Sequence, residues 1–295
     1  MKKFLTSLIA MMLAVVCCFG LTACNPEDPD ESAKWAFGKD WVPCESQLDT
    51  LTKLNNGTID VSIIDSVMAT YYATTGGYAD SIQIIDNLIL AQEEYGIAGR
   101  KQDKAFVSKI NEALIAVADH QYSTLIDSYG MQASKALSST DTNPLASATD
   151  NSWNKIVASG TINIGYTVFA PICYDVQSGV PTKGFDVDLA NAVVQYLNST
   201  YSLSLSITWV PIEWSAKEAK LSGGDIDLIW NGMTITPERS DAMCISVPYL
   251  YNRQVAVIRK ADANVYRSFM DLKNANIGFD SGSAGEAVCK KLSLT

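Results

Sequence analysis

Residues 227–239 read Asp-Leu-Ile-Trp-Asn-Gly-Met-Thr-Ile-Thr-Pro-Glu-Arg, and this stretch indicates the fold class. Its first four residues form a short apolar run that predicts a buried strand. Polar residues follow directly, and Pro237 has the character of a helix start. A strand that leads through a polar turn into a helix is the repeating unit of α/β proteins.

The same alternation continues on both sides of this stretch. Residues 161–167 and 203–210 are predicted as strands, and Ala190, Val193, Val194 and Leu197 between them fall at helical spacing. Further strands are expected at 255–258 and 276–279. Strands separated by helices predict parallel sheets covered on both faces.

The first part of the chain follows the same pattern. A helix through Leu48, Leu51 and Leu54 is expected to end at Asn56-Gly57, and residues 59–64 are expected to form a strand. Asp65 is then a plausible N-cap of the next helix. A helical stripe between residues 114 and 129 should stop at Gly130. Residues 138–152 are polar and without period, so they are interpreted as a linker.

The N-terminus carries the signs of export. A basic Met1-Lys2-Lys3 precedes an apolar run to Gly20, and Leu21-Thr22-Ala23-Cys24 resembles the lipobox of bacterial lipoproteins. This pattern predicts a signal peptide over 1–23, lipidation of Cys24 and a tether over 24–34. The protein would then be extracytoplasmic and bound to the membrane by a lipid. An uncleaved transmembrane anchor is the alternative.

Composition excludes several classes of function. The chain has a net charge of −10 and no basic cluster, so nucleic acid is not expected as a partner. His120 is the only histidine, which argues against histidine-based metal sites and Ser-His-Asp triads. No cofactor is predicted. After processing, Cys44, Cys173, Cys244 and Cys289 remain, and they allow three disulfide connectivities.

Residues 227–239 and the following Ile245-Ser-Val-Pro-Tyr249 resemble the signature of the family 3 extracellular solute-binding proteins, which are polar amino-acid receptors of ABC importers. Motifs at 169–171, 184–188, 221–225 and 282–286 occur in the family's order and at its spacing. The resemblance implies a two-lobed, periplasmic-binding-protein-like type II fold. It also implies a free amino acid as ligand, an ABC transporter permease as partner and no enzymatic activity.

The two halves of the family's sequence stand in inverted order in this chain. Residues 56–65 resemble the family's late strand, and residues 94–130 resemble its closing segment. A circular permutation explains this order, because exposed loops tolerate new termini. Lobe 2 is expected to comprise residues 35–91 and 251–295, and lobe 1 residues 92–137 and 153–250, with the linker 138–152 between the two parts of lobe 1. The hinges are expected near residues 92–94 and 251–253, where the chain crosses between the lobes. A truncated fusion of two tandem genes and a domain-swapped dimer are the alternatives.

The resemblance also assigns ligand-binding roles. Arg239 would bind the ligand carboxylate, because a guanidinium offers two parallel donors, and Gly232 and Thr234 would assist it. Asp65 would bind the ammonium group and could also cap its helix. Phe169 and Trp214 would flank the aliphatic part of the ligand.

Lobe 2 is expected to contribute a second group of contacts. The turn Gly282-Ser283-Ala284 resembles the family's carboxylate-binding turn at a helix N-terminus. Asp280, beside it, would favour a cationic or hydrogen-bond-donating side chain, and Tyr166 would contribute similarly. A dehydratase on the same scaffold is the rival from another class, and a non-transporting sensor or a remnant is the third hypothesis.

Overall fold

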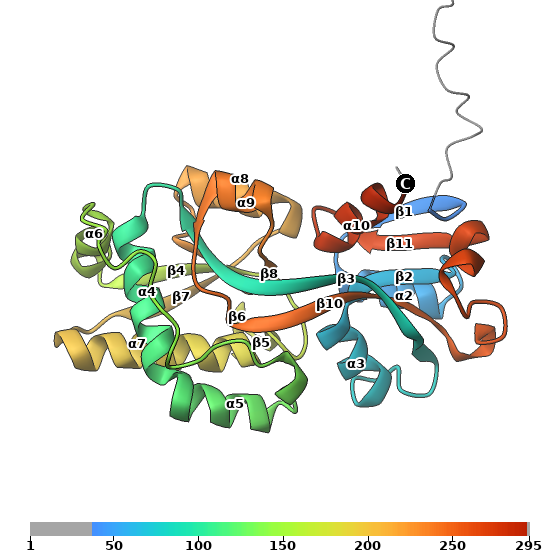
Figure 1. The fold of residues 1–295 in the computed structure, drawn as a ribbon, viewed down its shortest axis with the longest axis horizontal. Coiled ribbons are helices and arrows are strands. Elements are labelled where there is room, and N and C mark those ends of the chain that lie inside the picture. Colours follow the sequence, from blue (N-terminus) through green and yellow to red (C-terminus); the bar gives the residue numbers. More distant parts are fainter. Residues whose placement is uncertain (1–36, 294–295) are drawn as a thin grey trace, which may run out of the picture.

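The structure is a computed structural model that describes residues 37–293. The predicted signal peptide, Cys24 and the tether lie outside the described residues. Two lobes are visible in Figure 1, and two long strands, β3 (Ile82–Arg100) and β10 (Leu250–Arg259), run through both. The predicted two-lobed α/β class is confirmed.

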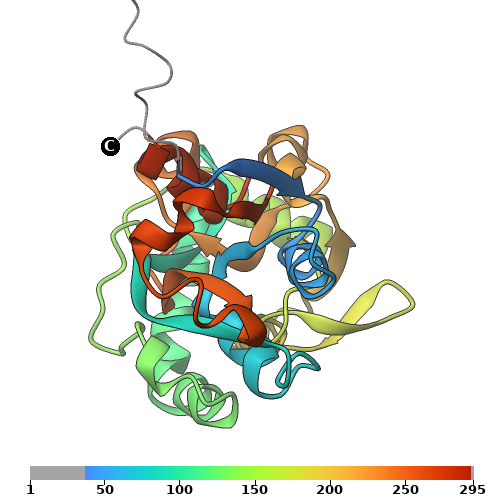
Figure 2. The same ribbon diagram turned by 90° about the vertical axis from the view of Figure 1, so that its right-hand side faces the viewer.

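One mixed sheet links the lobes, in the strand order β1-β11-β2-β10-β3-β8-β4-β7, with β9 paired to β3. Its remaining strands are β1 (Asp40–Cys44), β2 (Val61–Asp65), β4 (Thr161–Tyr166), β7 (Ser206–Pro211), β8 (Leu228–Thr234), β9 (Met243–Ile245) and β11 (Asn276–Asp280). A separate hairpin of β5 (Tyr174–Gln177) and β6 (Val180–Lys183) projects from the body in Figure 2.

Helices cover the sheet in both lobes (Figure 1). The α-helices are α2 (Gln47–Asn55), α3 (Ser66–Thr74), α4 (Lys104–Val117), α5 (Ser123–Ser128), α6 (Ser152–Ser159), α7 (Phe185–Tyr201), α8 (Lys217–Gly223), α9 (Pro237–Ala242) and α10 (Ala284–Ser293). A π-helical turn spans Ala118–Tyr122, and 3₁₀ turns span Gln132–Ser134, Trp214–Ala216, Lys260–Asp262 and Phe269–Asn274. Within residues 37–293, no helix is long and apolar enough to span a membrane.

The expected parallel pairing holds for only part of the sheet. β10 runs antiparallel to β2 and β3, and β3 runs antiparallel to β8 and β9. β3 and β10 carry the chain from one lobe to the other. They therefore run in the direction opposite to the neighbouring strands, which follow helices within a lobe. Parallel pairing holds elsewhere, as between β4 and β7 or β1 and β11.

The two segments interpreted as hinges pair directly with each other. Tyr251 faces Glu94, and Asn252 faces Glu93, in the antiparallel ladder of β10 and β3. The first part of β3 pairs with β10, whereas its last residues pair with β8 and β9. We call the part with β1, β2, β11 and most of β10 lobe 2, and the part with β4, β7, β8 and β9 lobe 1.

Segments from the two ends of the described chain build lobe 2 together. β11 lies between β1 and β2 and is parallel to both. Arg259 donates to the carbonyl of Ile59 at 2.5 Å and pairs with Asp60 at 3.2 Å, and Asp60 accepts from the N–H of Asn276. These contacts give Asp60 a structural role in lobe 2. The circular permutation and the assigned domain limits stay predictions.

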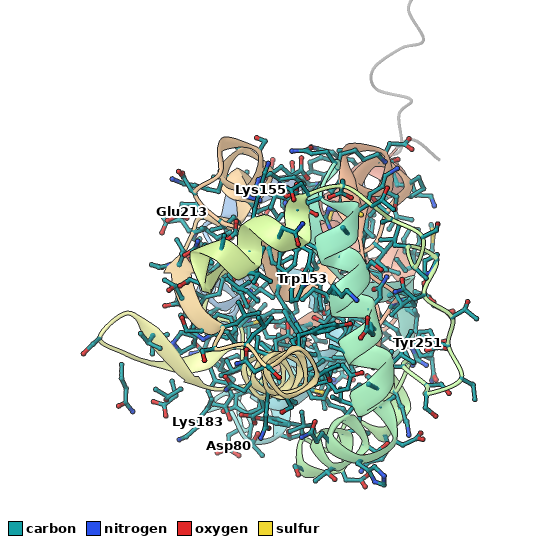
Figure 3. All side chains as sticks on the ribbon, turned by 90° about the vertical axis from the view of Figure 1, so that its left-hand side faces the viewer. Asp80, Trp153, Lys155, Lys183, Glu213 and Tyr251 are labelled. Carbon is teal, nitrogen blue, oxygen red and sulfur yellow. The ribbon has the colours of Figure 1, made fainter. Side chains whose placement is uncertain are left out.

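The linker is held against lobe 1 although it forms neither helix nor strand before α6. Asn143 donates to the carbonyl of Ser108 on α4 at 2.9 Å, and Asp150 accepts from the N–H of Ala105 at 2.7 Å. Trp153 lies beside α4 in Figure 3 and stacks on Phe106. The polar sequence of the linker is therefore used in side-chain caps and turns, which need no periodic apolar face.

Candidate functional site

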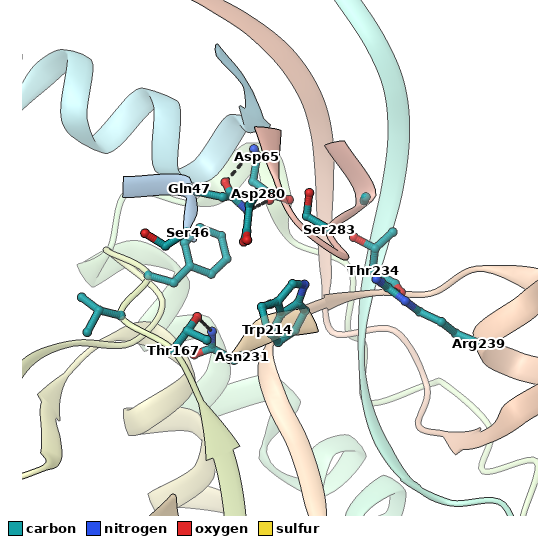
Figure 4. A pocket seen from close by; sticks show the side chains of 14 residues that line it. Ser46, Gln47, Asp65, Thr167, Trp214, Asn231, Thr234, Arg239, Asp280 and Ser283 are labelled. Atoms are coloured by element: carbon teal, nitrogen blue, oxygen red, sulfur yellow. Dashed lines mark hydrogen bonds between the residues drawn. The ribbon is translucent and has the colours of Figure 1, made fainter. Parts of the chain in front are cut away.

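A cavity lies between the lobes, and side chains from both line it (Figure 4). The lining residues are Ser46, Gln47, Asp65, Thr167, Val168, Phe169, Trp214, Asn231, Gly232, Thr234, Arg239, Asp280, Ser283 and Ala284. The structure thus brings together nine of the eleven residues expected to contact ligand, all but Tyr166 and Gly282. The space left free is about 20 Å³, enough for about one water molecule. An amino acid would enter only if the lobes separate or the lining side chains move.

Arg239 lies at the lobe 1 side of the cavity and is 9% exposed. It sits in α9, whose N-cap Thr236 accepts from the Arg239 N–H. Its guanidinium donates to the carbonyl of Thr234 at 2.7 Å and to the carbonyl of Gly282 at 3.2 Å. Among residues 37–293 it forms no salt bridge. A buried cation that is bonded only to neutral carbonyls has a strong electrostatic preference for an incoming carboxylate.

The strand end before Arg239 is occupied by internal contacts. The N–H of Gly232 donates to Asp186 at 2.8 Å, so it does not face the cavity as expected. Gly232 has φ of +62°, and a Cβ there would lie 2.6 Å from the Phe169 ring. Only glycine fits this position, because the backbone is left-handed and the aromatic ring is in contact. The hydroxyl of Thr234 donates to Glu93 at 3.1 Å.

Asp65 ends β2 and precedes α3, yet its side chain makes no N-cap hydrogen bond. Asp65 therefore holds the predicted N-cap position of α3, but its side chain does not cap the helix. Its carboxylate accepts from the Tyr95 hydroxyl at 2.6 Å and from Gln254 at 3.1 Å. The amides of Gln47 and Asn252 donate to it as well. The carboxylate turns toward the hinge because four side-chain donors meet it there, whereas the helix offers only a backbone N–H.

Glu93 forms a second buried carboxyl group in the hinge. It accepts from Asn252 at 3.0 Å and from Gln254 at 3.1 Å, and the same two amides also donate to Asp65. Burial and the neighbouring Asp65 raise the pKa of Glu93 to about 7, and burial raises the pKa of Asp65. The sequence placed Glu93 and Asn252 in the hinge. It did not reveal that they point inward, because isolated polar residues in a strand usually face solvent.

The turn on lobe 2 differs from its expected role. The N–H of Gly282 donates to Glu286 at 2.7 Å, and the N–H of Ser283 donates to the Asp280 carbonyl at 3.1 Å. Neither group is free for a ligand carboxylate in this conformation. The Gly282 carbonyl instead accepts hydrogen bonds from two cations of lobe 1, Arg239 and Lys217.

Lys217 was not recognised from the sequence. It is 3% exposed, and its ammonium donates to the carbonyls of Trp214 and Gly282 and lies 4.8 Å from the Trp214 ring. Burial and the neighbouring Arg239 lower the pKa of Lys217 to about 8. A lysine on the first turn of a short helix has no sequence signal for burial, because most lysines in helices are exposed.

The aromatic residues divide into two groups. Phe169 and Trp214 are almost fully buried and line the cavity, as expected. Trp214 faces Ser283 and Asp280 across the cavity in Figure 4. Tyr166 does not line it: its hydroxyl donates to the Gly179 carbonyl at 2.9 Å and its ring packs on Trp209. The structure therefore places Tyr166 in the core under the β5–β6 hairpin.

The described residues were also compared with the arrangements that metal sites and reactive thiols require. In the described part of the chain, no cluster of His, Cys, Asp or Glu has the arrangement of a metal site. The four cysteines within residues 37–293 are buried and unpaired. Burial raises the pKa of Cys44 to about 11 and that of Cys289 to about 12, so these thiols stay protonated near neutral pH.

Comparisons with known proteins point to one family. Residues 162–291 match the bacterial extracellular solute-binding proteins, family 3. The ABC transporter arginine-binding protein 1 of Escherichia coli K12 is 29% identical over 43% of this chain and 48% of that protein. A probable histidine-binding protein of Neisseria gonorrhoeae is 33% identical over 42% of this chain and 43% of that protein. A substrate binding protein from Streptococcus pneumoniae, solved with bound histidine, is 38% identical over 32% of this chain and 36% of that chain, with a TM-score of 0.27.

The family predicted from the motifs is therefore confirmed over residues 162–291. The matched relatives are solute-binding proteins and not enzymes, as predicted for this chain. The chain spans just under half of the length of the curated relatives it matches. These matches do not test the permuted order of the two halves.

Proposed function

We propose that the protein is an extracytoplasmic receptor that binds a free amino acid between its lobes. One observation carries the proposal: the unpaired guanidinium of Arg239 on lobe 1 and the carboxylates of Asp65 and Asp280 on lobe 2 line one cavity. A zwitterion needs a cation and an anion at fixed separation, and few other small molecules would compensate both.

Binding would be coupled to lobe closure. In an open form, Arg239, Phe169 and Trp214 would be accessible on lobe 1. A ligand held by Arg239 would reach Asp65 only when the hinge strands β3 and β10 bring lobe 2 over it. Contacts that exist only in the closed form shift the equilibrium toward that form. The Gly282 carbonyl, which accepts from Arg239 here, would be displaced by the ligand carboxylate.

The finer parts of the proposal rest on the sequence. Lipidation at Cys24 would hold the receptor at the membrane, and the closed form would be recognised by an ABC transporter permease. The resemblance of residues 56–65 and 94–130 to the late segments of the family supports a circularly permuted receptor made of one chain. Binding by a monomer would separate this arrangement from a swapped dimer.

Calorimetry of the purified protein with pooled amino acids, with its mass in solution recorded, tests the proposal. We expect saturable binding that Arg239→Ala weakens by about 100-fold or more, because a buried charge pair contributes a few kcal/mol. Arg253→Ala is the matched control, since Arg253 is an exposed hinge arginine whose loss should leave affinity unchanged. A folded protein that binds no amino acid would contradict the proposal.

A further inference from the structure

Asp280 brings into the cavity a buried carboxyl oxygen that lacks a hydrogen-bond partner among the described residues. It ends β11, lines the cavity and is 6% exposed. Its Oδ1 atom is buried and has no hydrogen-bond partner within residues 37–293. In Figure 4 its side chain points into the space between Gln47 and Trp214. A buried carboxylate oxygen without a donor is costly, so a native site normally provides a partner when it is occupied.

The charges around Asp280 do not compensate it. Asp65, Glu213 and Glu286 all disfavour its ionised form, and Lys217 favours it. Lys217 gives its hydrogen bonds to the carbonyls of Trp214 and Gly282 and makes no salt bridge within the described residues. Burial and Asp65 together raise the pKa of Asp280 to about 8. The surroundings of Asp280 therefore favour its neutral form, and within the described residues no cation is bonded to its carboxyl group.

Asp280 and Asp65 differ in the number of hydrogen bonds that their carboxyl groups accept within the protein. Asp65 already accepts four hydrogen bonds from Gln47, Tyr95, Asn252 and Gln254. A zwitterionic ligand would place its carboxylate at Arg239 and its ammonium near Asp65, and it would add no net charge. Asp280 would then stay uncompensated beside a second carboxylate. A ligand with one more cationic group would remove that imbalance.

We infer that the ligand is an amino acid with a positively charged side chain, and that Asp280 binds this second cation. This inference rests on the proposed function and names the substrate class of the same site. Trp214 lines the cavity opposite Asp280, and its ring face would stabilise the same cationic group.

The test compares L-arginine with L-citrulline, which has nearly the same shape but an uncharged side chain. We expect the purified protein to prefer arginine by about 30-fold or more, the range for a buried hydrogen-bonded charge pair. Asp280→Asn should remove most of this preference by weakening arginine binding and should change citrulline binding little. L-Lysine and L-glutamine form a second pair with the same expected order.

Controls separate this inference from the proposed function. Glu213→Gln removes an exposed carboxylate that also acts on Asp280, and it should keep the preference for arginine. Thermal unfolding of each variant shows whether it is folded. If the protein binds neutral amino acids as tightly as arginine, or if Asp280→Asn keeps the preference, the inference is wrong although the receptor function stands. If no amino acid binds to the folded protein, both fail.

Discussion

Glu93 should make the ligand-free protein less stable as the pH rises, and Glu93→Gln should remove this effect. The carboxyl group is 9% exposed and shares the amides of Asn252 and Gln254 with Asp65. Its pKa rises from 4.5 to about 7 on folding, mainly through burial and then through Asp65. The folded protein therefore binds more protons than the unfolded chain between these pH values. Stability is full below about pH 4.5 and is lost as the pH rises through 7.

The size of this loss follows from the shift. Each pKa unit corresponds to 1.36 kcal/mol, so ionising Glu93 in the folded protein costs about 3 kcal/mol. Glutamine has no charge to bury and keeps a carbonyl that accepts from the two amides. The variant should therefore gain about 3 kcal/mol relative to the native protein between pH 5 and pH 8. Part of this gain in stability arises because the Asp65 carboxylate no longer has a negatively charged neighbour.

Denaturant unfolding followed by circular dichroism at pH 5, 6, 7 and 8 measures the effect. Glu94→Gln is the matched control, because Glu94 is the next residue of β3 and is exposed. The reasoning is refuted if the stability difference between Glu93→Gln and the native protein is the same at every pH. It is also refuted if Glu94→Gln shows an equal pH dependence.

Two further predictions concern packing. Gly232→Ala should destabilise the protein by about 1–3 kcal/mol, because the backbone has a positive φ and an added Cβ would contact the Phe169 ring. The midpoint of denaturant unfolding measures this loss, and an unchanged midpoint would contradict the prediction. Cys44 and Cys289 should react with a thiol reagent at pH 8 far more slowly in the native protein than in guanidinium chloride, because burial keeps them protonated. Fast labelling of the native protein at either residue, located by mass spectrometry, would show that these thiols are accessible.

Local sequence was sufficient to predict where several helices and strands begin and end. The helix through Leu51 and Leu54 ends before Gly57, which has φ of +82°, and the long helical stripe stops at Gly130. Such signals depend on residues a few positions apart, and glycine alone readily adopts the left-handed backbone that ends these helices. The positions of Arg239, Asp65 and Asp280 in the cavity were also predicted, through motifs that span a single strand end each.

Only the tertiary structure decided which partners these side chains meet. Asp65 bonds to donors from β3 and β10 instead of its own helix, Glu93 turns inward beside it, and Tyr166 goes into the core. These outcomes depend on strands up to 189 positions apart in the chain, as between Asp65 and Gln254. Periodicity shows which face of an element is apolar, but it does not show which element covers that face. In the hinge, where two strands cross between lobes, buried polar groups are stabilised by donors that only the folded arrangement brings together.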